Sequence, residues 1–136
     1  MGNEKRTVVI VEDEPAAAEM FAEMMRVSGF NVFHTSSSEQ AVSLIAREKP
    51  DLVLLDVMMP GVSGLEVVRF VRREPHLAHI PVIIISARTT EEDIQEGLEA
   101  GADLYLTKPI SFGDLEEAMQ QILPEDDSEP QGDAPS

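Results

Sequence analysis

Short apolar runs recur along the chain, and longer segments with helix-like periodicity separate them. The runs cover residues 7–11, 31–34, 52–55, 82–85 and 103–106. The first, third and fourth are apolar at nearly every position and rich in Val, Ile and Leu, which is typical of strands covered on both faces. The pattern therefore predicts five strands, three of them central and two nearer the edges of a sheet.

The segments between these runs have recognisable helix ends. Pro15 suits the first turn of a helix, residues 36–40 (SSSEQ) offer a capping box, and Ser111 suits an N-cap. Gly29 and Gly101 are typical of residues that end a helix. We predict helices from residue 15 to before Gly29, after residues 36–40, and over about 64–73, 90–100 and 111–123.

Strands and helices thus alternate five times along the chain. Connections of this length favour parallel strands joined by right-handed crossovers. The expected fold class is α/β, an open parallel sheet with helices on both faces, which makes three layers. In such sheets ligands bind beyond the carboxyl ends of the strands, so the residues that follow each strand are the first candidates for function.

The length of 136 residues suits one domain. The last stretch, residues 124–136 (PEDDSEPQGDAPS), holds five acidic residues, three prolines and no basic residue. Unbalanced charge and few apolar side chains cannot offset the entropy that is lost on ordering. We expect a folded body over residues 1–123 and an acidic, disordered tail or linker stub over residues 124–136.

Charge and composition exclude several classes of function. Lys and Arg total 10 against 26 Asp and Glu, a net charge of −16, which argues against direct binding of nucleic acid. The absence of cysteine excludes disulfides, zinc–thiolate and iron–sulfur sites. No apolar run approaches the roughly 18 residues of a membrane span, and the first residues lack the apolar core of a signal peptide. We expect a soluble cytoplasmic protein with no membrane contact.

Five residues with complementary chemistry follow the predicted strands. Glu12 and Asp13 come after the first strand, Asp56 after the third, Ser86 after the fourth and Lys108 after the fifth. Carboxylates that meet at one sheet edge repel one another unless a cation lies among them. Oxygen-only ligands are typical of Mg²⁺ or Mn²⁺ sites that also hold a phosphate, and Lys108 supplies a positive charge for that phosphate.

Taken one at a time, these residues have ordinary structural explanations. Asp13 suits a helix cap, Asp56 a turn, Ser86 the start of a helix and Lys108 an exposed charge at the sheet edge. Their combination is harder to explain, because residues of the required type fall at the same end of four different strands. We therefore favour one functional site over several unrelated structural roles.

Four segments carry a more specific signal: residues 9–14 (VIVEDE), 51–61 (DLVLLDVMMPG), 85–87 (ISA) and 106–109 (LTKP). In order, spacing and residue type they resemble the receiver domain of two-component response regulators, such as the chemotaxis receivers, over about residues 6–123. The resemblance implies the flavodoxin-like receiver fold. This is a three-layer α/β/α arrangement around a five-stranded parallel sheet in the order 2-1-3-4-5.

The resemblance also implies a role for each candidate in phosphoryl transfer. Asp56 is the nucleophile that accepts the phosphoryl group as an acyl phosphate. Asp13 and Asp56 hold Mg²⁺ through their carboxylates and Met58 through its backbone carbonyl, while Glu12 acts through a metal-bound water. Glu12 stands where many relatives have aspartate, a tolerated departure that weakens any case for direct ligation there.

Three further positions acquire roles by the same resemblance. Ser86 hydrogen-bonds a phosphoryl oxygen, Lys108 pairs with it, and a cis peptide bond before Pro109 aims Lys108 inward. Ser86 and Tyr105, the sole tyrosine, form a switch in which Tyr105 rotates inward when Ser86 moves toward the phosphate. The ordinary alternative for Tyr105 is a half-buried aromatic side chain on an edge strand.

The function implied is that of a phosphorelay response regulator. A histidine kinase or histidine phosphotransfer protein donates the phosphoryl group to Asp56. The face made by the fourth helix, fifth strand and fifth helix then engages a downstream protein, or a second copy of the chain as a homodimer. Such a chain is a signalling switch rather than an enzyme, because it catalyses only its own phosphotransfer and dephosphorylation.

Two other functions stay open at this stage. One is a phosphorylation-independent interaction module, a pseudo-receiver, although such a chain is expected to lack the acids or the lysine. The other is an aspartyl phosphatase, which is disfavoured because Met58 stands where a second acid is needed. A nucleotide or flavin protein on the same fold is disfavoured too, since residues 12–15 (EDEP) contain no glycine.

Overall fold

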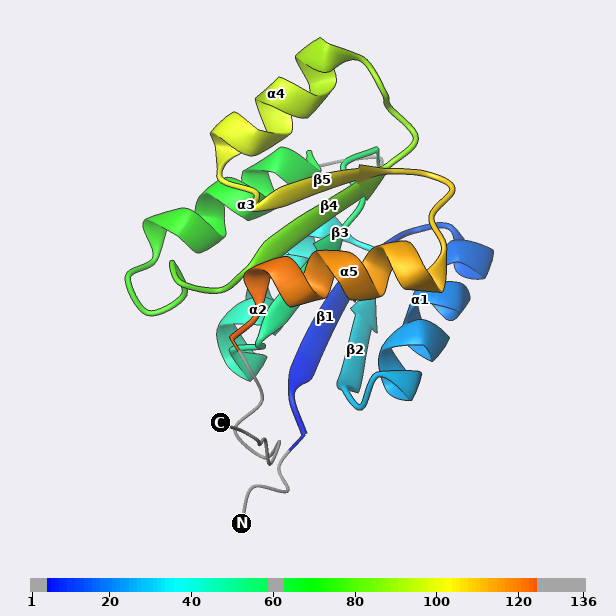
Figure 1. Cartoon of the computed structure of the whole chain (residues 1–136). Helices are drawn as coiled ribbons and strands as arrows, with labels where there is room; N and C mark the ends of the chain where they lie inside the picture. The colour runs from blue at the N-terminus through cyan, green and yellow to red at the C-terminus, as the bar shows by residue number, and fades with distance from the viewer. Residues whose placement is uncertain (1–4, 59–62, 125–136) are drawn as a thin grey trace, which may run out of the picture.

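Ten elements follow one another in the expected order in this computed structural model, which describes residues 5–58 and 63–124 (Figure 1). The strands and the last three helices begin and end within one residue of their predicted bounds. No helix in the described residues is long and apolar enough to cross a membrane. The predicted tail after Pro124, and residues 59–62 of the motif after Asp56, lie outside the described residues. The elements are β1 (Thr7–Val11), α1 (Pro15–Val27), β2 (Asn31–Thr35), α2 (Ser38–Glu48), β3 (Leu52–Leu55), α3 (Gly64–Arg73), β4 (Val82–Ser86), α4 (Glu91–Ala100), β5 (Leu104–Thr107) and α5 (Phe112–Ile122).

The sheet is parallel throughout, and its strand order is β2-β1-β3-β4-β5, as predicted. β1, β3 and β4 are central, and nearly all of their side chains are buried. The reason is visible in Figure 1, where helices lie on both sides of the sheet: α1 and α5 cover one face, and α2, α3 and α4 cover the other. The three-layer α/β/α fold is thereby confirmed.

Two apolar clusters hold the three layers together. Val9 and Val11 of β1 pack toward α2 and α3, whereas Val8 and Ile10 of the same strand pack toward α1 and α5. Burial of a large apolar side chain stabilises a fold by roughly 1.5–3 kcal/mol, so these two clusters are the main source of stability. Because packing uses nearly every position of the central strands, polar site residues are confined to the carboxyl ends of the strands and the residues that follow them.

The helix ends follow the sequence signals with one difference. Pro15 opens α1, and Ser111 and Asp114 form a reciprocal capping box at α5. At α2 only half of the predicted box forms: the Ser37 hydroxyl accepts a hydrogen bond from the Gln40 N–H at 3.2 Å. The Gln40 side chain does not reach back to the N-cap, because it accepts a hydrogen bond from the Thr35 hydroxyl at 3.2 Å.

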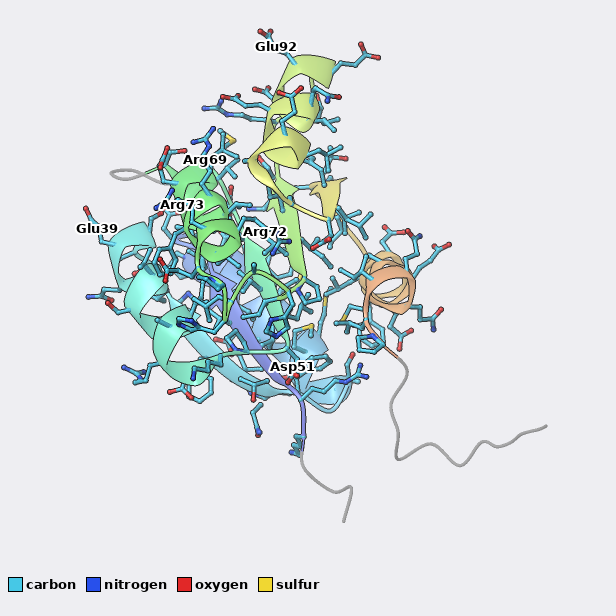
Figure 2. The ribbon with its side chains drawn as sticks, turned by 90° about the vertical axis from the view of Figure 1, so that its left-hand side faces the viewer. Glu39, Asp51, Arg69, Arg72, Arg73 and Glu92 are labelled. Atoms are coloured by element: carbon cyan, nitrogen blue, oxygen red, sulfur yellow. The ribbon has the colours of Figure 1, made fainter. Side chains whose placement is uncertain are left out.

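Arg72 joins several segments at the end of the sheet where the strands begin. In Figure 2 it lies on the side of α3 that faces β4, whereas Arg69 and Arg73 lie on the outer side of that helix. From this position its guanidinium reaches backbone carbonyls of residues that lie outside α3. It donates hydrogen bonds to the carbonyls of Ala78 (3.0 Å), Ile80 (2.7 Å) and Gly101 (2.9 Å) and to Asp103 Oδ2 (2.8 Å).

Replacing Arg72 by alanine should lower the free energy of unfolding by about 2 kcal/mol, because the carbonyls and Asp103 lose a charged donor. Urea denaturation measures the change. Arg69→Ala is the matched control. It removes an arginine whose side chain is 40% exposed and forms an ion pair with Glu66 on the same helix, and it should cost about 0.5 kcal/mol or less. Equal effects of the two substitutions would show that the contacts of Arg72 add nothing beyond those of a surface arginine.

Candidate functional site

The predicted site residues lie at one edge of the sheet, at or just beyond the carboxyl ends of four strands. Glu12 directly follows β1, Asp56 follows β3, Ser86 ends β4 and Lys108 follows β5. The strands point the same way in Figure 1, so their carboxyl ends share one edge. Strand pairing across β1, β3, β4 and β5 therefore brings together residues that are up to 96 positions apart in the sequence.

Three charged side chains form the buried centre of the site. Lys108 Nζ lies 2.9 Å from Asp56 Oδ2 and 3.1 Å from Glu12 Oε1. Glu12 is only 2% exposed and Asp56 only 6% exposed. Their remaining oxygens accept backbone hydrogen bonds, Asp56 Oδ1 from the Met58 N–H at 2.8 Å and Glu12 Oε2 from the Glu14 N–H at 3.2 Å. Each buried charge is thus hydrogen-bonded, as burial in an apolar setting requires.

Burial and charge shift the pKa of two groups in this cluster. Burial is the largest influence on Glu12 and raises the pKa of its carboxyl above 4.5; the charge of Asp56 adds to the rise, and hydrogen bonds from Lys108 and Glu14 oppose it. Burial by itself lowers the pKa of Lys108, but hydrogen bonds and charge from Asp56 and Glu12 outweigh it and raise that pKa above 10.5. One ammonium group contacts two carboxylates, so the cluster has more negative than positive groups.

Asp13 does not join this cluster. Its side chain is exposed, and among residues 5–58 and 63–124 no three acidic or histidine side chains lie close enough together to hold a metal ion. The expectation that three carboxylates converge therefore holds for two of them.

The oxygen donors around the cluster suit a hard divalent cation. Glu12 and Asp56 offer carboxylates in an environment that lacks positive charge, and Asp13 is the next residue along the chain from Glu12. Met58 lies beside Asp56 and is 46% exposed, so its backbone borders the site at the surface. Carboxylate and carbonyl oxygens are the ligands that Mg²⁺ and Mn²⁺ take in proteins, so the chemistry of these donors matches such a cation, although Asp13 stands outside the buried cluster.

Ser86 and Tyr105 are linked through Arg88, which stands two residues beyond Ser86 and flanks the predicted site. The fully buried Ser86 accepts a hydrogen bond at Oγ from the Arg88 N–H at 3.1 Å. The carbonyl of Arg88 accepts a hydrogen bond from the Tyr105 hydroxyl at 3.0 Å. Both bonds use backbone atoms of Arg88, which any residue type could supply, so the link between Ser86 and Tyr105 has no signal in the sequence.

The segment after β5 has the expected geometry. The peptide bond between Lys108 and Pro109 is cis, as the resemblance implies. The Lys108 N–H donates to the Ser86 carbonyl at 2.9 Å, which extends the β4–β5 contact past the end of β5. Tyr105 is half-buried and packs against the core cluster on the α4 side of the sheet.

Sequence comparison places this geometry in a known family. The pattern of the response regulator receiver domain matches residues 8–120, which is most of the chain. The chain belongs to the response regulator receiver family. This membership and the strand order confirm the resemblance seen in the sequence, and the receiver fold explains why the acids, the serine and the lysine share one sheet edge.

Similar proteins are also regulators. The phosphate regulon transcriptional regulatory protein PhoB of Pseudomonas aeruginosa is 38% identical to this receiver over 118 residues, which are 87% of this chain and 52% of that protein. This receiver therefore spans about half the length of the regulators of that group that it matches.

Solved structures with the same fold include a response regulator and a receiver domain. A putative response regulator from Chloroflexus aurantiacus has a TM-score of 0.83 and 31% identity, and the match covers 88% of this chain and 98% of that one. The receiver domain of the sensor histidine kinase PA1611 from Pseudomonas aeruginosa has a TM-score of 0.81 and 27% identity, with the same coverage. That second structure has a magnesium ion coordinated in its active site cleft.

Proposed function

We propose that this receiver accepts a phosphoryl group on Asp56 from a sensor histidine kinase or a histidine phosphotransfer protein. The observation that carries the proposal is the buried Asp56 carboxylate, held by the Lys108 ammonium at 2.9 Å and the Met58 N–H at 2.8 Å. An oxygen of Asp56 attacks the phosphorus, and the bond from phosphorus to the donor's histidine nitrogen breaks. The products are an acyl phosphate and an imidazole that has taken up a proton from water.

A divalent cation completes the proposed site. Mg²⁺, or Mn²⁺ in its place, would be held by Asp13, Asp56 and the backbone carbonyl of Met58, with Glu12 acting through a water. When bound, the cation offsets charge on the phosphoryl oxygens. The shortage of positive charge around Glu12 and Asp56 supports this assignment, and so does the magnesium ion in the PA1611 receiver.

Lys108 and Ser86 would stabilise the transferred group. Lys108 Nζ lies in hydrogen-bond contact with Asp56, so a phosphoryl oxygen on that residue would come within reach of the ammonium. Ser86 is fully buried at the same sheet edge, and its hydroxyl has a hydrogen to donate because its present bond uses Oγ as an acceptor. Positive charge and donors aimed at the phosphoryl oxygens are what phosphoryl transfer requires.

A downstream partner of the switch would bind the face made by α4, β5 and α5. Ser86 and Tyr105 both hydrogen-bond the backbone of Arg88, which lies two residues before Thr90, the N-cap of α4. α4 carries five acidic residues and no basic residue, which favours a basic or mixed protein partner and disfavours direct contact with nucleic acid. Homodimer formation through this face would need basic residues from another part of the second copy.

The receiver would act on itself rather than on an external substrate. In this reading it catalyses only its own aspartyl phosphotransfer and dephosphorylation, as a signalling switch does. The intact set of acids, serine and lysine argues against a pseudo-receiver. The position of Met58, two residues after Asp56, argues against a phosphatase because a second acid is missing there.

Intact mass after incubation with acetyl phosphate tests the proposal. With Mg²⁺ present, we expect a gain of about 80 Da, the mass of one phosphoryl group, and with EDTA no gain. A phosphohistidine protein should serve as donor in a second reaction. The absence of an adduct with both donors would contradict the proposed function and would favour a phosphorylation-independent interaction module on the same fold.

A further inference from the structure

Gly97 is a buried residue in the middle of α4. Glycine is a poor residue for a helix interior, so its presence there needs a reason. A Cβ atom built on Gly97 would lie 2.9 Å from Ile84 Cδ1, 2.9 Å from Tyr105 Cδ2 and 3.2 Å from Tyr105 Cε2. The missing side chain therefore leaves room that two neighbouring side chains occupy.

The two neighbours differ in how easily they could move away. Ile84 Cδ1 is the tip of a flexible side chain, which can shift by rotation of one bond. Cδ2 and Cε2 of Tyr105 belong to a rigid ring, which must move as a whole in a close-packed interior. A Cβ at position 97 would therefore force the tyrosine ring to shift from its present place against α4.

A second contact holds the other end of the same ring. The Tyr105 hydroxyl donates to the Arg88 carbonyl at 3.0 Å, and the Arg88 N–H donates to Ser86 Oγ at 3.1 Å. Tyr105 is thus held along its edge by α4 and at its tip by Arg88. A movement of Ser86 Oγ that disturbs the backbone of Arg88 would also disturb the acceptor of the tyrosine hydroxyl.

We propose that Gly97 is a positioning residue of the switch. The space at Gly97 and the hydrogen bond to the Arg88 carbonyl together hold the Tyr105 ring inward against α4. The inference rests on the proposed function, in which the inward ring accompanies phosphorylation of Asp56. A side chain at position 97 should displace the ring and so disfavour the phosphorylated form.

Tyrosine fluorescence tests the position of the ring directly. The chain has one tyrosine and no tryptophan, so emission excited in the tyrosine band reports on Tyr105 alone. In Gly97→Ala the acrylamide quenching constant should rise about twofold, because the new methyl group would clash with the ring and displace it toward solvent. Gly113→Ala is the matched control, since a Cβ on Gly113 of α5 would meet only Ser111 Oγ at 3.8 Å, and it should quench like the wild type.

Phosphorylation by acetyl phosphate tests the coupling. The phosphorylated fraction at steady state should fall about threefold in Gly97→Ala and stay unchanged in Gly113→Ala, because a few-fold shift is typical of a change in one contact of a two-state element. In a Tyr105→Ala background, Gly97→Ala should have no further effect, because the ring that the methyl group displaces is gone. A purely structural effect on α4 would persist without the ring.

Each result decides the inference. Equal quenching of the wild type and Gly97→Ala would overturn the positioning role, and an effect on phosphorylation that persists in the Tyr105→Ala background would overturn the coupling. If the wild type forms no adduct, the proposed function fails and the coupling fails with it, while the quenching comparison still decides where the ring lies. Should Gly97→Ala not fold, its combination with Ile84→Val removes the Ile84 Cδ1 contact and keeps the contact with the ring.

Discussion

An Asp56→Asn variant should form no phosphoryl adduct, with acetyl phosphate or with a phosphohistidine donor, in the presence of Mg²⁺. The neutral amide is a poor nucleophile, so the attack on phosphorus fails. The fold should persist, because the amide oxygen can still accept the hydrogen bond that the Met58 N–H donates to Asp56 Oδ1. Intact mass measures the result as the loss of the gain of about 80 Da that the wild type shows.

Asp51→Asn is the matched control for this substitution. Asp51 precedes β3 and Asp56 follows it, so the two aspartates flank the same strand at opposite ends of the sheet. The Asp51 carboxylate accepts a hydrogen bond from the Thr7 N–H at 2.8 Å, and asparagine retains an acceptor for that bond. Asp51→Asn should be phosphorylated like the wild type. An adduct of full yield on Asp56→Asn would place the acceptor on another residue.

Lys108→Met should slow phosphorylation at least about 100-fold, the usual effect of removing one group that stabilises charge in a transition state. Methionine has a similar length and no charge, so Asp56 and Glu12 lose the ammonium that contacts both of them. The rate of adduct formation with acetyl phosphate at saturating Mg²⁺ measures the change. Lys5→Met is the control, because Lys5 is exposed and its loss should leave the rate unchanged.

The same variant should be less stable at neutral pH by about 1–3 kcal/mol, because two buried carboxylates then lack their counter-charge. In the wild type the raised pKa of Glu12 means that the folded state binds the proton more tightly than the unfolded state. Stability from this group therefore falls as pH rises from 4.5 through the folded pKa. The variant lacks the hydrogen bond and charge of Lys108, which lower the pKa of Glu12. In the variant, the pH range over which stability falls therefore extends to higher pH.

Urea denaturation of both proteins in EDTA at several pH values measures this dependence. The stability deficit of Lys108→Met should be largest at neutral pH and should shrink as pH falls toward 4.5, when Glu12 takes up a proton. Lys108 itself stabilises the wild type below pH 10.5, and that contribution to stability is lost as the pH rises through the raised pKa of Lys108 in the folded state. A deficit that does not change with pH would show that packing, not charge, is what Lys108 contributes.

Much of the site could be predicted from the sequence because its side chains follow strands with clear patterns. Glu12, Asp56, Ser86 and Lys108 each stand beside the end of an apolar run, and strand pairing brings them to one edge. The separation of Asp13 from the other acids could not be predicted in this way. Asp13 is exposed whereas its neighbour Glu12 is buried, and no local pattern distinguishes two adjacent acids in this way.

The sequence by itself determined the order of strands and helices, the central place of β1, β3 and β4, and the residues gathered at the sheet edge. Hydrophobic periodicity and helix caps are local signals, and parallel pairing turns them into one arrangement. Only the tertiary structure decided that Arg72 binds carbonyls up to 29 positions away, that Arg88 joins Ser86 to Tyr105, and that Gly97 leaves room for a ring. These features depend on backbone atoms of segments far apart in the sequence and on the space between elements. Local patterns of residue type contain no information about either.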